Sequence, residues 1–66
     1  MHESIGDIVR KYRLLRRLSR AELAEMCGLS YHAIYSIEEG RRLDPVLSSV
    51  VALAGSLKIP PKEVIR

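Results

Sequence analysis

Apolar residues recur in the first part of the chain at the spacing of one helix face. Ile5, Val9 and Tyr12 follow one another at intervals of four and three residues. At these intervals, side chains lie on the same side of an α-helix. Ser4 stands just before the series and can cap the first turn. The pattern predicts a helix over about residues 5–16.

Two further helices are predicted on either side of Gly28. Ser19 opens a serine-x-x-glutamate capping box, which is typical of a helix start. Gly28 ends this helix, because glycine accepts a positive φ without steric cost. Ser30 can cap the next helix at once, and Gly40 ends that one. The sequence therefore predicts a sharp turn between two short helices within residues 19–40.

A fourth and a fifth helix are predicted beyond this unit. Asp44 and Pro45 form a cap and first-turn pair. The inward stripe of the fourth helix then comprises Leu47, Val50, Ala54 and Leu57. Pro60 and Pro61 forbid its continuation, and Pro61 can start one last short turn. We therefore expect an all-α fold of five helices.

Length and composition favour one small helical domain. A chain of 66 residues buries only about 60% of the surface that its unfolded form exposes, which leaves no room for a separate catalytic domain. Apolar residues make up 47% of the chain, without Trp or Phe, and this composition suits close helix packing better than an aromatic-rich β-sandwich. We predict a single compact domain over residues 1–66.

The charge balance is compatible with a nucleic acid partner. Lys and Arg number 11 against 8 Asp and Glu, giving a net charge of +3. Most of the basic residues are arginines, which suit bidentate contacts with phosphates and bases. A small basic excess is also common in proteins that never meet nucleic acid, so the charge alone decides little.

Several classes of protein are disfavoured by what the sequence lacks. Cys27 is the single cysteine, which excludes an internal disulfide and makes the cytoplasm the default location. Apolar runs fall short of the roughly 20 residues that a membrane span needs. The sequence has neither a phosphate-binding glycine loop nor a spacing of His, Cys and acids typical of a metal site. We expect a non-enzyme without metal or cofactor, and a buried, inert Cys27 thiol.

Residues 20–34 carry the spacing of a helix-turn-helix. Counting from Arg20, Ala24 is fifth, Gly28 is ninth and Ile34 is fifteenth. The alanine must be small where the next helix crosses it, the glycine makes the turn, and the isoleucine fills the angle between the helices. Such a unit, over about residues 19–40, projects its second helix from the body. That helix fits a DNA major groove, which is about 12 Å wide.

Nearly the whole chain resembles the lambda-repressor-like (Xre- or Cro-type) family of DNA-binding proteins. The resemblance is carried by "IGDIVRKYRLLRRLSRAELAEMCGLSYHAIYSIEEGRR" and then "LSSVVALAGSLKI". The matching positions are Leu18, Ser19, Ala24, Gly28, Ile37, Glu38, Gly40, Pro45 and Leu47. The resemblance implies a transcriptional regulator of prokaryotic or phage type, and specifically a repressor. It would read double-stranded DNA with the helix at about residues 30–39.

The resemblance also implies roles for individual residues. The base-reading positions of the family correspond to Tyr31, His32, Tyr35 and Ser36. Its phosphate-contacting positions correspond to Ser19, Arg20, Arg41 and Arg42. Arg13 and Glu38 match an ion pair that ties the first helix to the end of the third. For the two tyrosines of the third helix the alternative is packing against a neighbouring element.

Three positions depart from the family pattern. Arg20 stands where glutamine is common, so a contact that orients a neighbouring side chain becomes mainly a charge contact. Arg17 replaces a common glycine at the end of the first helix. Glu39 occupies a commonly polar or basic position, and it would repel phosphate if it faced DNA.

Excess apolar residues near the C-terminus predict a homodimer. After the stripe of the fourth helix is counted, the remaining residues are Val46, Val51, Ile59, Val64 and Ile65. Related proteins commonly pair through this region. A symmetric pair fits a palindromic operator whose half-sites lie about 34 Å apart.

A different class of function remains open from the sequence. Ile8, Leu14 and Leu15 stand where this family usually carries charged residues. They would suit an antitoxin or accessory module that uses the same fold mainly to bind a protein partner. The operator, the direction of regulation and the extent of the full protein also stay open.

Overall fold

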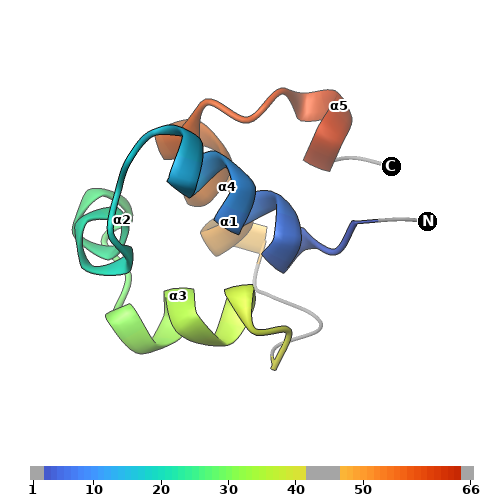
Figure 1. The fold of residues 1–66 in the computed structure, drawn as a ribbon. Coiled ribbons are helices and arrows are strands. Elements are labelled where there is room, and N and C mark those ends of the chain that lie inside the picture. Colours follow the sequence, from blue (N-terminus) through green and yellow to red (C-terminus); the bar gives the residue numbers. More distant parts are fainter. Residues whose placement is uncertain (1–2, 42–46, 65–66) are drawn as a thin grey trace.

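The computed structural model describes residues 3–41 and 47–64, apart from the side chain of Val64 (Figure 1). All regular structure within these residues is helical. The helices are α1 (Ile5–Leu15), α2 (Arg20–Cys27), α3 (Tyr31–Glu38), α4 (Leu47–Leu57) and α5 (Pro61–Val64). The predicted all-α fold of five helices is confirmed. Asp44 and Pro45, the predicted start of the fourth helix, lie outside the described residues.

The first three helices begin at serine caps. The hydroxyl groups of Ser4, Ser19 and Ser30 each accept a hydrogen bond from the amide three residues later, at 3.0 or 3.1 Å. The first two caps are complete capping boxes, in which Asp7 and Glu22 accept a bond from the cap amide. Bonds with Ser19 hold the pKa of Glu22 below its ordinary value. The predicted starts are therefore confirmed, and their cause is local.

Left-handed residues follow four of the helices, including Gly40 with φ 72° after α3. Gly28 has φ 69° at the end of α2, as predicted. Arg17, after α1, and Lys58, after α4, have φ 58° and 55° although they carry side chains. Glycine is common in the family at the position of Arg17 because this conformation crowds a Cβ atom.

Replacing Arg17 by glycine is expected to raise the free energy of unfolding by about 0.5–1 kcal/mol, since relief of the crowded backbone outweighs the added freedom of the unfolded chain. Thermal unfolding measures the change. Arg16→Gly is the matched control, because Arg16 has a negative φ and its Nε donates to the Leu57 carbonyl at 3.1 Å. This control should be less stable than the parent. A lower melting temperature for Arg17→Gly would contradict the account.

One apolar core joins the helices. Its buried members are Ile8, Val9, Leu23, Ala24, Ile34, Ile37, Leu53, Leu57 and Ile59. Helices α1 and α2 each contact both α3 and α4. In Figure 1, α3 lies along the lower edge of the molecule beneath α1, while α5 lies at the upper edge. The side of α3 that faces away from this core is therefore free to meet a partner.

The inward side of α4 differs from the predicted stripe. Leu47 is 75% exposed, whereas Leu53, which the stripe omitted, is 1% exposed. Leu53 and Leu57 lie one turn apart and define the buried side. Leu47 lies about 120° around the helix from Leu53, because successive residues rotate by about 100°. The prediction that Leu47 packs in the core is wrong.

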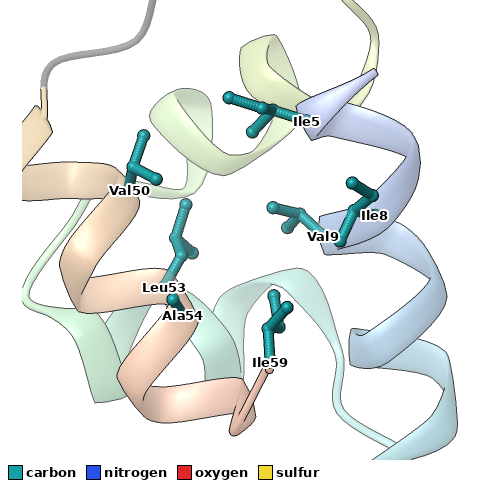
Figure 2. A pocket seen from close by; sticks show the side chains of 7 residues that line it. All are labelled: Ile5, Ile8, Val9, Val50, Leu53, Ala54 and Ile59. Carbon is teal, nitrogen blue, oxygen red and sulfur yellow. The ribbon is translucent and has the colours of Figure 1, made fainter. Parts of the chain in front are cut away.

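Ile8 and Ile59 also lie in the core instead of on a surface. They line a small apolar cavity of about 10 Å³ between α1 and α4, together with Ile5, Val9, Val50, Leu53 and Ala54 (Figure 2). Ile8 is buried because α1 is covered by both α3 and α4. Ile59 is turned inward by the left-handed Lys58 that precedes it. Neither the partner surface predicted for Ile8 nor the dimer surface predicted for Ile59 is correct.

Candidate nucleic-acid interface

The turn between α2 and α3 holds the two helices in a fixed relation. Leu23 and Ala24 of α2 and Ile34 of α3 are 0%, 5% and 0% exposed. The left-handed Gly28 reverses the chain, and the Leu29 amide donates to the Ala24 carbonyl at 2.9 Å. The three positions that predicted a helix-turn-helix thus have the expected structural roles. Ala24 is the small residue where α3 crosses α2, Gly28 makes the turn, and Ile34 fills the angle between the helices.

The outward side of α3 carries the four residues predicted to read bases. Tyr31 is 53% exposed and His32 is exposed, while Tyr35 and Ser36 are partly exposed. On the opposite side, Ile34 and Ile37 are buried in the core. Because these two side chains fix the rotation of α3 about its axis, the outward residues form one polar, aromatic surface.

His32 and Ser36 form a pair on this surface. The Ser36 Oγ and the His32 Nε2 lie 3.4 Å apart, one helical turn from each other. Both groups donate or accept hydrogen bonds, depending on the imidazole tautomer. The pair therefore offers donors and acceptors of the kind that recognise base edges.

Behind this surface, Glu38 at the end of α3 is buried among arginines. Arg13 Nε donates to its Oε2 at 2.7 Å and Arg13 Nη2 to its Oε1 at 3.0 Å. The structure thus brings together the two residues predicted to pair. It adds Arg20 Nε at 3.0 Å and Arg10 Nε at 3.4 Å from Oε1. The carboxylate joins α1 and α2 to the end of α3.

The arginines keep Glu38 charged despite its burial. Removal from water raises the pKa of the Glu38 carboxyl, but the hydrogen bonds from Arg13 and Arg20, together with their positive charges, outweigh that effect. The pKa of the Glu38 carboxyl therefore lies below its ordinary value. At neutral pH the carboxylate is therefore ionised and holds its ion pairs.

Glu39 extends this cluster toward the surface. Its Oε2 accepts from Arg10 Nη2 at 2.6 Å and from Arg20 Nη2 at 3.3 Å. The residue expected to repel phosphate is thus paired with two arginines. The sequence alone indicated no role for Arg10. The sequence spaces Arg10 and Arg13 one helical turn apart, but it does not show that they meet the consecutive Glu38 and Glu39.

The residues predicted to contact phosphate have different surroundings. Ser19 is exposed and caps α2, and Arg41 is exposed after α3. The Arg20 side chain is only 22% exposed and is engaged by both glutamates. Arg42 lies outside the described residues. Phosphate contact by Ser19, Arg41 and Arg42 stays a prediction.

Two guanidinium groups lie over the ring of Tyr35. The Cζ atoms of Arg20 and Arg41 are 5.1 and 5.8 Å from its centroid. A guanidinium within about 6 Å of an aromatic centroid is attracted by the ring. Tyr35 is therefore held by side chains from α2 and from the segment after α3.

Two apolar surfaces lie away from α3. One is a groove of about 340 Å³ along α4 and α5, lined by Leu47, Val50, Val51, Ala54, Gly55, Ile59 and Pro61. Of the predicted dimer residues, Val51 is 62% exposed here. Val46, Ile65 and the side chain of Val64 lie outside the described part of the chain. The other surface is at the end of α1, where Leu14 and Leu15 are 59% and 63% exposed.

Other kinds of site find little support in the described residues. Among them, no group of three or more His, Cys, Asp or Glu side chains is placed to hold a metal ion. None of the helices described is long and apolar enough to cross a membrane. Cys27 is partly buried, and its Sγ lies 3.8 Å from the Ala52 carbonyl oxygen of α4.

Comparison with known proteins identifies one family. A model of the helix-turn-helix family matches residues 9–64. Searches of curated proteins and of solved structures found no match. The matched region contains all of α2, α3 and α4 and most of α1. It therefore includes every element that builds the outward surface of α3 and the buried cluster behind it.

Proposed function

Because the chain belongs to the lambda-repressor-like helix-turn-helix family of DNA-binding regulators, we propose that it is a sequence-specific transcriptional repressor. It places α3 in the major groove of double-stranded DNA. The observation that carries this proposal is the division of α3 into a buried isoleucine side and an exposed side with Tyr31 and His32. A helix fixed in this way presents the same side chains to every site it meets.

The contacts would divide into two kinds. The four outward residues of α3 would meet base edges, where hydrogen-bonding patterns distinguish the base pairs of the major groove: Tyr31, His32, Tyr35 and Ser36. Ser19 and Arg41 would meet phosphates and set the register of the protein on the duplex. The protein supplies no catalytic group in this scheme and acts by occupying its site.

Replacing both Tyr31 and His32 by alanine is expected to relax sequence preference at the base pairs that they contact, by about 1–3 kcal/mol for each good contact. Selection of bound sites from a random DNA pool, with the parent and the double variant in parallel, measures the effect. Lys62→Ala on α5, at the edge of the molecule opposite α3 (Figure 1), is the control and should select the parental consensus. An unchanged consensus for the double variant would refute the assignment.

We further propose that two copies pair through α4 and bind a palindromic operator. The groove beside the exposed Leu47 and Val51 supports this placement, since a monomer leaves both side chains in water. A two-fold contact there repeats the same surface on both copies.

Charge placed in this groove is expected to separate the copies. Val51→Lys should sediment as a monomer at micromolar concentration, because pairing would bury an unpaired ammonium group. Leu15→Glu, at the exposed end of α1, is the matched control and should remain dimeric. Monomers from Leu15→Glu and dimers from Val51→Lys would move the two-fold axis to α1.

The exposure of Leu14 and Leu15 favours one second candidate function. In this scheme the chain is an antitoxin or accessory module whose α1 end holds a protein partner. DNA binding by the purified chain at increasing salt separates the two candidates. A DNA-binding regulator loses affinity steeply as salt rises, whereas a module that binds only protein shows no binding to lose.

A further inference from the structure

Arg20 lies at the centre of a network that connects the buried Glu38 and the exposed Glu39 to the outward side of α3. We term this side the reading surface; it comprises Tyr31, His32, Tyr35 and Ser36. Its Nε donates to Glu38 and its Nη2 to Glu39, at 3.0 and 3.3 Å. Its Cζ lies 5.1 Å from the centroid of the Tyr35 ring. Two of the three guanidinium nitrogens are thus engaged within the protein. Of its five N–H donors, the two used in these bonds reach a phosphate only if a bond within the protein breaks.

Arg20 is also fixed at its backbone. It is the first residue of α2, directly after the Ser19 cap, whose hydroxyl accepts from the Glu22 amide at 3.0 Å. A side chain held at the backbone by the cap and at its head by two carboxylates loses little further freedom when a ligand arrives. Contact with such a side chain restricts Tyr35 before DNA is met.

Glu39 contributes the outer half of this restraint. Its carboxylate bridges Arg20 of α2 and Arg10 of α1, and Arg10 Nη2 also donates to the Glu38 carbonyl at 3.3 Å. Near DNA a carboxylate lowers affinity for every sequence, since it repels phosphate. The Glu39 carboxylate offsets this loss of affinity if it restricts the side chains of the reading surface before DNA binds.

We propose that Arg20 and Glu39 are positioning residues for base reading: Glu39 holds the Arg20 guanidinium over Tyr35, which sets the orientation of this ring for the major groove. This inference rests on the proposed DNA-binding function. It replaces the prediction that Arg20 is mainly a charge contact with phosphate. The Arg20 pKa is raised above its ordinary value, first by a hydrogen bond with the Tyr31 side chain and then by that with Glu38.

Two substitutions separate positioning from charge. Arg20→Lys keeps the positive charge but loses the planar fork and the stack on the ring. Glu39→Gln removes the negative charge and weakens the hold on Arg20. Affinities of the full chain would be measured for the consensus duplex selected by the parent and for a scrambled duplex, over a range of salt concentrations.

Positioning predicts a loss of discrimination. In Arg20→Lys, the ratio of consensus to scrambled affinity should fall by about fivefold or more, the scale of one lost base contact, with the salt dependence unchanged. In Glu39→Gln, the same ratio should fall although affinity for scrambled DNA rises. Glu25→Gln is the control, because it removes one charge from an exposed residue of α2; its ratio should match that of the parent.

The outcomes distinguish this inference from the function on which it rests. If the parent binds both duplexes equally or binds neither, the proposed function fails and the inference fails with it. If the parent discriminates and both variants, folded by circular dichroism, keep its ratio, only the inference is overturned. A salt dependence weakened by about one counterion in Arg20→Lys, at an unchanged ratio, would mark Arg20 as a phosphate contact. In the free protein, nuclear Overhauser contacts between the Arg20 side chain and the Tyr35 ring should be present in the parent and weakened in Glu39→Gln.

Discussion

Replacing Gly6 by alanine is expected to lower the free energy of unfolding by about 3 kcal/mol, at the upper end of the usual cost of overpacking. The same change inside a helix normally raises stability by about 0.5–1 kcal/mol. The sign reverses because a Cβ atom at Gly6 would overlap the Ile37 carbonyl oxygen and approach that of Glu38 to 3.1 Å. Both obstacles are backbone atoms, so neither can rotate away. Helices α1 and α3 would have to separate.

Gly55→Ala provides the matched control. Gly55 lies within α4, and a Cβ atom there would meet nothing within 4 Å. Stability should therefore rise by about 0.5–1 kcal/mol, the ordinary gain from replacing a helical glycine. Denaturant unfolding followed by circular dichroism compares the two variants with the parent. Equal stability of Gly6→Ala and Gly55→Ala would show that α1 and α3 do not approach as closely as described.

Local signals made the helix boundaries predictable from the sequence. Ser4, Ser19 and Ser30 each cap a helix through a bond that spans only three residues. Gly28 ends α2 through its own backbone conformation. Interactions of this range depend on neighbours that the sequence shows directly. The helix-turn-helix spacing belongs to the same class, because all its members lie within two adjacent helices.

Burial was predicted less well because it depends on neighbours that are distant in the sequence. A single stripe describes a helix packed on one side, yet α1 is covered by both α3 and α4. Ile8 is therefore buried beside Val9. Leu47 has the apolar character of a core residue, but nothing in its local spacing shows where α4 meets the rest of the protein. The close approach at Gly6 was missed for the same reason.

The candidate site shows the same difference between features set by local spacing and features set by distant residues. The outward residues of α3 followed from the family pattern and the periodicity of one helix, and contact with DNA stays a prediction for them. The arginine cluster joins three helices, so the spacing of Arg10, Arg20 and Glu39 does not disclose it. Only the pair of Arg13 and Glu38 was expected, through the family resemblance, and the structure places it inside a larger network.

Glu38→Leu is expected to be among the most destabilising single changes, with a loss of about 3–5 kcal/mol, because it strands a buried charge. The Arg13 side chain is only 11% exposed and would lose its partner. Arg13→Met should cost less, since Glu38 would keep Arg20 at 3.0 Å and Arg10 at 3.4 Å. Its main further loss is the bond from Arg13 Nη1 to the Leu18 carbonyl, 2.8 Å in the parent.

The double variant Arg13→Met with Glu38→Leu should recover part of the loss, because neither buried charge then remains. We expect it to be more stable than the sum of the single effects predicts, by about 1–3 kcal/mol. The control cycle combines Arg16→Met with Glu38→Leu. Arg16 bonds to the Leu57 carbonyl and does not share a partner with Glu38, so these losses should add. Chemical unfolding of the six proteins gives both coupling energies, and strict additivity in the Arg13 cycle would mean that the buried pair does not hold α1 to α3.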